Sequence, residues 1–152
     1  MGILFLFVGK TKEGFMRDGI EKYAGLIKHY VPVEVREIKG SSLDDHAAAI
    51  EAEADSMLSR LLPGDCLIAL DERGKNPLSV EFAGELGGML ETGRRLVFVI
   101  GGPFGLSARV RDRAELVLSL SRLTFTHEMA RLILAEQVFR AFTIIKGRTY
   151  HY

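Results

Sequence analysis

Short apolar runs alternate along the chain with longer amphipathic stretches. Five runs have the length and composition of strands, and four of them are almost continuously apolar. They span residues 3–8, 33–38, 66–70, 96–100 and 116–120. A strand that is apolar on both sides is covered on both sides. The pattern therefore predicts an α/β domain with a mostly parallel sheet flanked by helices.

Apolar residues recur at helical spacing between these runs. The stretches span residues 15–30, 50–61 and 82–90. Ser42 followed by Asp45 resembles a capping box in front of the second helix, and Ser79 is a candidate cap for the third. We expect the Pro63-Gly64 pair to stop the second helix.

A final helix is expected over residues 128–145, and its apolar surface is too broad for a single narrow stripe. A helix that is apolar on more than one side needs two partners. In a chain this small the second partner is predicted to be another subunit, although a helix enclosed by its own core explains the same pattern.

The length of 152 residues fits one domain, residues 1–152, with roughly two-thirds of the unfolded surface buried. Hydrophobic residues make up 47% and charged residues 26%, as in ordinary soluble proteins. Cys66 is the single cysteine, so neither an internal disulfide nor a cysteine metal cluster is expected. No histidine or carboxylate spacing suggests a metal site. The run over residues 3–8 is a strand rather than a signal peptide, and a cytoplasmic location is expected.

Charge is balanced overall but unevenly distributed. Residues 107–152 hold eight basic and four acidic residues, whereas residues 41–66 hold six acidic residues and one basic residue, Arg60. An uneven field of this kind can direct a phosphate backbone to one end of a neutral protein. Solvated helix faces account for the same pattern equally well.

A glycine-rich segment, Gly101-Gly102-Pro103-Phe104-Gly105, directly follows the strand at 96–100. Glycines let the backbone approach a ligand closely, and ligands bind at the carboxyl ends of parallel strands. The spacing is not that of a nicotinamide-binding loop. His127 is either a general base or a solvated side chain. Residues 71–75 are expected to form a polar turn at the carboxyl end of a strand, which either serves a substrate or is simply solvated.

Several stretches, taken in order, resemble one family. They are Phe7-Val8-Gly9-Lys10, residues 70–75, residues 98–106, residues 119–125, Arg131 with residues 134–141, and Tyr150-His151. Together they resemble the SPOUT-class methyltransferases that modify N3 of a pseudouridine in large-subunit ribosomal RNA. The resemblance covers essentially the whole chain. It implies an α/β domain whose C-terminal segment forms a trefoil knot, and a homodimer with the cofactor near the subunit boundary.

The resemblance also implies S-adenosylmethionine as cofactor and assigns the residues that contact it. These are Leu70, Gly101, Gly102, Gly105, Leu120, Ser121, Arg122, Leu123, Thr124 and Phe125. For catalysis we assign His151 to orientation of the acceptor or proton removal, Arg140 to stabilising the anion or holding phosphate, and Tyr150 to stacking on a base.

Two positions depart from the family pattern. Thr126 stands where a proline is usual, and Tyr152 stands where a basic residue usually follows Tyr-His. With so small a body and no separate RNA-binding domain, the protein is expected to act on ribosomal RNA in the assembled ribosome. A non-catalytic ribosome-binding module and a different nucleotide-cofactor enzyme on an α/β sheet remain the alternatives.

Overall fold

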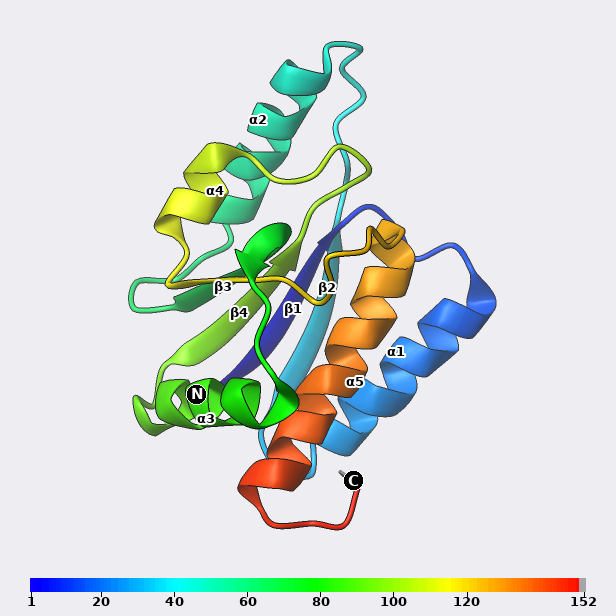
Figure 1. Cartoon of the computed structure of the whole chain (residues 1–152). Coiled ribbons are helices and arrows are strands. Elements are labelled where there is room, and N and C mark those ends of the chain that lie inside the picture. Colours follow the sequence, from blue (N-terminus) through cyan, green and yellow to red (C-terminus); the bar gives the residue numbers. More distant parts are fainter. Residues whose placement is uncertain (151–152) are drawn as a thin grey trace.

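A five-stranded, fully parallel sheet forms the centre of the protein (Figure 1). The structure, a computed structural model, describes residues 1–150. The strands are β1 (Gly2–Val8), β2 (Val33–Ile38), β3 (Cys66–Lys75), β4 (Arg95–Ile100) and β5 (Leu116–Leu118), in the order β2-β1-β4-β3-β5. The predicted fold class, a parallel sheet flanked by helices, is confirmed.

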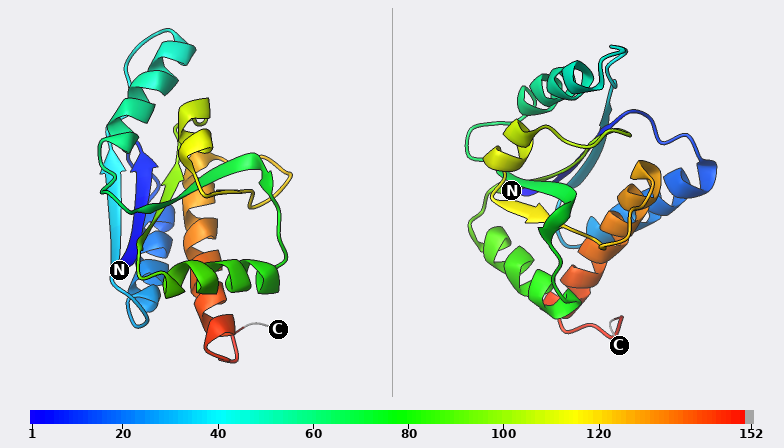
Figure 2. Two further views of the ribbon diagram at one scale, coloured as in Figure 1. Left: turned by 90° about the vertical axis from the view of Figure 1, so that its left-hand side faces the viewer. Right: turned by 45° about the horizontal axis from the view of Figure 1, so that its top comes forward.

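Helices cover both faces of this sheet (Figure 2). They are α1 (Gly14–Ile27), α2 (His46–Leu58), α3 (Ser79–Glu91), α4 (Ala108–Arg113) and α5 (His127–Ile145). Alternate strand residues point to opposite sides. Phe5 and Phe98 therefore pack under α1, α3 and α5, while Leu6 and Val99 pack under α2 and α4. None of the helices within residues 1–150 is long and apolar enough to cross a membrane.

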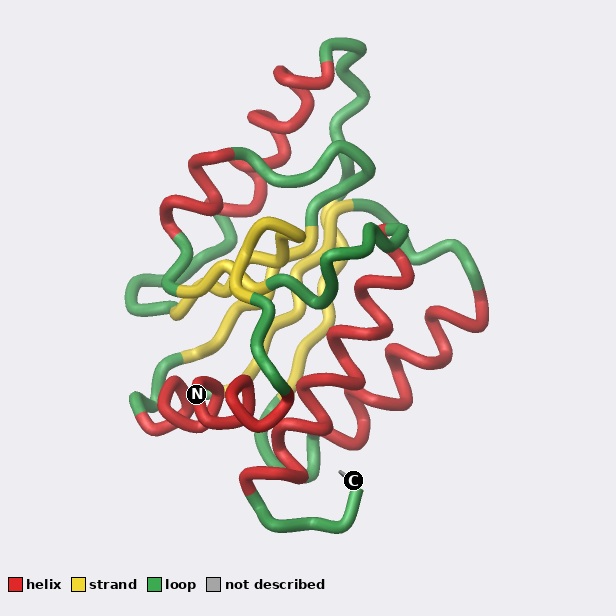
Figure 3. Tube along the Cα trace, viewed as in Figure 1, coloured by secondary structure: helices red, strands yellow, loops and turns green. Residues whose placement is uncertain are grey.

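Three local expectations from the sequence are wrong. Residues 71–75 do not form a simple turn, because β3 continues through them and curls round at its end (Figure 3). Asp45 rather than Ser42 caps α2, accepting a hydrogen bond from the Ala47 N–H at 3.0 Å. Leu78 rather than Ser79 is the cap of α3, and the Leu78 N–H donates to Glu81 at 2.8 Å.

The short helix α4 was not predicted at all. Only Val110 is buried among its six residues, so its sequence carries no helical apolar stripe. Its start is fixed instead by Ser107, whose side chain accepts a hydrogen bond from the Arg109 N–H.

The broad apolar surface of α5 is used within its own chain. This helix packs on the sheet between α1 and α3, and it buries Leu134, Val138 and Phe142 in the same core as β1 and β4. This packing accounts for one side of the surface only: Ile133 is partly buried and Ile145 is exposed, and the second subunit stays a prediction.

The segment after β3 crosses the segment that leads from β5 to α5 (Figure 1). At this crossing Asn76 Nδ2 donates to Ser119 O at 2.9 Å, and Ser119 N donates to Lys75 O at 2.7 Å. The trefoil knot of the C-terminal segment stays a prediction from the resemblance.

Candidate functional site

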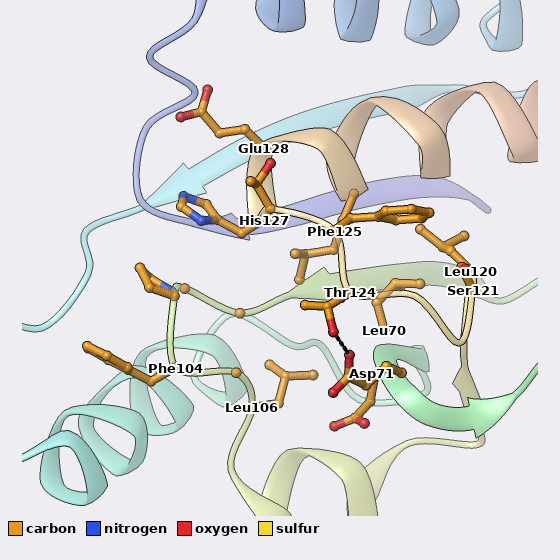
Figure 4. Close-up of a pocket in the computed structure, with 18 of the residues that line it drawn as sticks. Leu70, Asp71, Phe104, Leu106, Leu120, Ser121, Thr124, Phe125, His127 and Glu128 are labelled. Atoms are coloured by element: carbon orange, nitrogen blue, oxygen red, sulfur yellow. Dashed lines mark hydrogen bonds between the residues drawn. The ribbon is translucent and has the colours of Figure 1, made fainter.

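A cavity of about 770 Å³ opens at the carboxyl edge of the sheet (Figure 4). Its walls are the end of β3, the loops that follow β4 and β5, and the first turn of α5. Nine of the ten predicted cofactor residues line it: Leu70, Gly101, Gly102, Gly105, Leu120, Ser121, Leu123, Thr124 and Phe125. Arg122 does not line the cavity and is exposed. Residues from one strand and two separate loops thus meet at one site.

The glycine loop is compact because it has no side chains at its contact points. A Cβ at Gly101 would lie 2.5 Å from the Gly105 carbonyl oxygen, which is closer than any side chain tolerates. Gly105 has φ +87°, and its N–H donates to Gly102 O at 3.0 Å. The loop therefore depends on glycine at both positions.

The curled end of β3 brings two carboxylates to the cavity. Asp71 accepts hydrogen bonds from the Arg73 side chain and the Arg73 N–H, and these bonds hold the pKa of Asp71 below its usual value. Glu72 accepts a hydrogen bond from Thr124 Oγ1 at 2.7 Å (Figure 4). This bond ties the β3 end to the loop before α5.

The loop after β5 is shaped by its own hydroxyl groups. Ser119 Oγ donates to Ser121 O at 2.9 Å, and Ser121 Oγ accepts from the Leu123 N–H at 2.9 Å. Thr126 caps α5, since its side chain accepts from the Met129 N–H at 3.2 Å. The threonine found where the family usually has proline therefore stabilises the start of this helix by a different means.

The first turn of α5 completes the wall. Glu128 Oε1 accepts hydrogen bonds from the N–H groups of Lys12 and Glu13, at 2.9 and 3.0 Å, and so joins α5 to the β1–α1 loop. His127 lines the cavity, and burial, with a smaller contribution from the nearby Arg131 guanidinium, lowers its pKa. The imidazole is therefore neutral near pH 7.

Arg131 anchors α5 beneath this site. Its side chain is fully buried and donates to Val8 O at 2.6 Å and to Thr11 Oγ1 at 2.8 Å. Its guanidinium also lies 4.9 Å from the centre of the Phe7 ring and 3.4 Å from Glu37. These contacts fix the start of α5 against the end of β1. The start of α5 is one wall of the cavity.

Four carboxylates are among the lining residues that the sequence did not assign to the cofactor. Glu13, Asp71, Glu72 and Glu128 all line the cavity. The sequence could have indicated that residues 71 and 72 line the cavity, because they directly follow the predicted buried strand at 66–70 and ligands bind at the carboxyl ends of parallel strands. No sequence signal indicated that Glu13 and Glu128 line the cavity, since only the fold brings the β1–α1 loop to the start of α5.

The predicted catalytic residues gather elsewhere in the chain. Arg140 donates to Glu136 Oε1 at 2.8 Å, and Tyr150 donates to the same oxygen at 3.0 Å. Burial and the Glu136 hydrogen bond raise the pKa of Tyr150. Arg140 follows Glu128 by 12 positions, about 18 Å along a helix. His151 lies outside the described residues.

The fold compensates part of the uneven charge seen in the sequence. Arg109 of the basic segment pairs with Glu51 and Asp55 of the acidic segment, at 2.7 and 2.8 Å, because α4 packs on α2. Arg131 and Arg140 also have carboxylate partners. These pairs compensate only part of the basic excess near the C-terminus.

The sequence profile of the family described as "Predicted SPOUT methyltransferase" matches residues 1–151. The chain belongs to the SPOUT methyltransferase family. Among its relatives are proteins named ribosomal RNA large subunit methyltransferase H. The one from Thermotoga neapolitana is 40% identical over 97% of both chains, and the one from a Geobacter species is 44% identical over 100% of this chain and 99% of the relative.

Solved structures show that this SPOUT chain shares its fold with other methyltransferases. A probable methyltransferase from Bordetella pertussis has a TM-score of 0.55 at 16% identity, covering 91% of this chain and 95% of that one. The SpoU methyltransferase AviRb from Streptomyces viridochromogenes, solved with S-adenosylmethionine, has a TM-score of 0.50 at 16% identity, covering 95% of this chain and 58% of that one.

Proposed function

We propose that this SPOUT chain transfers a methyl group from S-adenosylmethionine to N3 of a pseudouridine in large-subunit ribosomal RNA, on the assembled ribosome. The observation that carries the proposal is the cavity, since nine residues assigned to the cofactor line it together. The printed names of the full-length relatives support a ribosomal RNA substrate, and the cofactor in the Streptomyces structure supports the donor.

The cavity suits the cofactor in size and chemistry. Its volume of about 770 Å³ lies within the range of small-molecule sites. Leu70, Leu118 and Leu120 offer an apolar surface for adenine, and backbone groups of residues 120–125 would hold adenine and ribose. The carboxylate of Glu128, which accepts from backbone N–H groups, favours a positively charged ligand, whereas Asp71 is already paired with Arg73.

Bound S-adenosylmethionine supplies a methyl group on a positively charged sulfur, which is already electrophilic. The residues of the chain then have to place the acceptor nitrogen in line, exclude water and remove the N3 proton. In this proposal His151 orients the acceptor or takes that proton, Arg140 stabilises the resulting anion or holds a phosphate, and Tyr150 stacks on a base.

Two copies of the chain are needed for these residues to act together. Arg140 and Tyr150 lie near the C-terminal end of α5, whereas the cavity lies at its N-terminal end (Figure 1). In a two-fold symmetric dimer with antiparallel α5 helices, the C-terminal residues that follow α5 in one copy, here called the tail, would reach the cavity of the other copy. We therefore propose a homodimer with composite sites.

The direct test is transfer of a labelled methyl group. Purified protein is incubated with labelled S-adenosylmethionine and either ribosomes that lack the modification or the naked RNA from them. We expect label at one pseudouridine N3, and only on ribosomes. Ribosome binding without transfer would contradict the enzymatic function, whereas efficient methylation of a short stem-loop would contradict the need for the ribosome.

A further inference from the structure

The rim of the cavity carries an aromatic side chain that faces solvent. Phe104 is 54% exposed, while Leu106 in the same loop is buried. An exposed phenylalanine such as Phe104 contributes much less to the stability of the fold than a buried one does. The Gly105-to-Gly102 hydrogen bond and the close approach at Gly101 hold the backbone of the loop that presents this ring.

A second ring supports Phe104 from one side. The imidazole of His46 stacks on it with 3.7 Å between ring centres and 19° between ring planes. His46 is the first residue of α2, whose start is fixed by the Asp45 cap. Phe104 lies on the side of the cavity away from Thr124 and Leu120 (Figure 4). The stacked pair is thus a rigid, half-exposed aromatic surface beside the entrance.

Two exposed lysines lie just beyond the carboxyl edge of the same sheet. β1 and β2 are paired up to Val8 and Ile38, so Lys10 and Lys39 follow neighbouring strand ends. The Glu53 carboxylate lies against both Gly40 and Gly102, which places the Lys39 loop next to the glycine loop.

Nearby carboxylates are already engaged by the protein. Glu53 accepts a hydrogen bond from the Ser41 N–H at 2.9 Å, and Glu37 accepts from the Thr11 N–H and from Arg131. Within residues 1–150 neither Lys10 nor Lys39 forms an ion pair, so both charges are available to an incoming anion.

We propose that Phe104, backed by His46, is a stacking platform for an RNA base that neighbours the methylated one, with Lys10 and Lys39 holding the adjoining phosphates. The inference rests on the proposed function and names how the same site recognises its RNA. Unpaired bases stack on aromatic side chains whatever their sequence, and phosphates supply charge complementarity to lysine.

The platform is tested by separating RNA recognition from cofactor binding. For Phe104→Leu we expect the KM for ribosomes to rise about 5- to 100-fold, which is the usual loss of one stacked base. The dissociation constant for S-adenosylmethionine, measured by calorimetry, should not change. Phe104→Tyr keeps a flat ring and should retain the KM, while His46→Ala should raise it by a smaller factor.

The lysines are tested through salt dependence. Each phosphate contact contributes about 0.7 to the slope of log affinity against log salt for a single strand. We expect Lys10→Gln and Lys39→Gln each to lower that slope in ribosome binding. Lys28→Gln, an exposed lysine at the other end of α1, is the matched control and should leave the slope unchanged.

Three results would overturn the platform. Phe104→Leu could leave the KM unchanged, could weaken cofactor binding as much as it raises the KM, or could shift the sedimentation coefficient and so belong to a contact between copies. Failure of the proposed function is separate: the wild-type protein would transfer no methyl group to ribosomes. Cosedimentation of Phe104→Leu with ribosomes would still test the platform in that case.

Discussion

At the residue scale, glycine decides the shape of the cavity. Gly101 leaves no room for a methyl group because the Gly105 carbonyl, a backbone atom, occupies that space. Backbone atoms move only with their whole loop, and this loop also carries Gly102 and Phe104. A single methyl group at position 101 therefore affects every contact that the loop makes.

Gly101→Ala is expected to weaken S-adenosylmethionine binding by about tenfold or more, since overpacking of this kind typically costs about 1–3 kcal/mol. Calorimetric titration measures the effect. Gly88→Ala is the matched control, because Gly88 is exposed on α3 with nothing near its Cβ position. That variant should gain about 0.5–1 kcal/mol in stability and bind normally. Equal affinities for both variants would contradict a cofactor role for the loop.

At the scale of elements, the start of α5 is the most connected point of the site. Thr126 caps this helix, Glu128 holds the β1–α1 loop, and Arg131 holds the end of β1. Because α5 also forms one wall of the cavity, its first turn couples the stability of the helix to the shape of the site.

Thr126→Ala removes the cap of α5 and should lower the free energy of unfolding by about 1 kcal/mol, or a few degrees in Tm. Urea and thermal unfolding measure this loss. Thr126→Ser keeps the hydroxyl and serves as the control. If alanine and serine proved equally stable, the hydroxyl would not be acting as a cap.

A second tie between elements joins the starts of β3 and β4. Asp65, directly before β3, accepts hydrogen bonds from Arg95 at 2.6 and 3.0 Å and from the Leu62 N–H at 2.7 Å. Burial alone would raise the pKa of Asp65, but the Arg95 and Leu62 hydrogen bonds outweigh it and the pKa is lowered. The ionised form is therefore the one that stabilises the fold.

Asp65→Asn should cost about 1–3 kcal/mol of stability at pH 7, because Arg95 loses its charged partner. A lowered pKa gives stability that is complete above the unfolded value of about 3.9 and is lost as the pH falls through the folded value. The difference in the free energy of unfolding between variant and wild type should therefore become smaller below about pH 4. Urea unfolding from pH 3 to pH 7 checks this, with exposed Asp18→Asn as control. A difference in unfolding free energy that stays constant with pH would contradict the stabilising role of ionised Asp65.

At the scale of the whole molecule, the proposed chemistry is divided between two ends of one helix. His127 and Glu128 line the cavity. Arg140 lies more than three turns further along the helix, Tyr150 follows the end of the helix, and both are held by Glu136. A working site would then need the cavity of one copy and the tail of another.

Mixing two inactive variants tests this division. If sites are composite, Gly101→Ala and His151→Ala chains mixed and reassembled in equal amounts should regain about one quarter of wild-type activity, because half of the dimers pair one intact cavity with one intact tail. Each variant alone should be inactive when the S-adenosylmethionine concentration is kept well below the dissociation constant of the Gly101→Ala variant. Methyl transfer to ribosomes is the measurement. If every site were built from one chain, the mixture would show no recovery.

The sequence by itself predicted the strands, four of the five helices and most of the loop residues that line the cavity. Buried parallel strands must be apolar along their length, and the ordered family motifs marked residues 101–105 and 120–125. Only the tertiary structure decided which charges remain free, because Arg109 and Glu51 lie far apart in the sequence and meet through helix packing. It also brought Glu13 and Glu128 into one wall and set Phe104 against His46. Such contacts depend on distances in space, which local patterns of polarity do not encode.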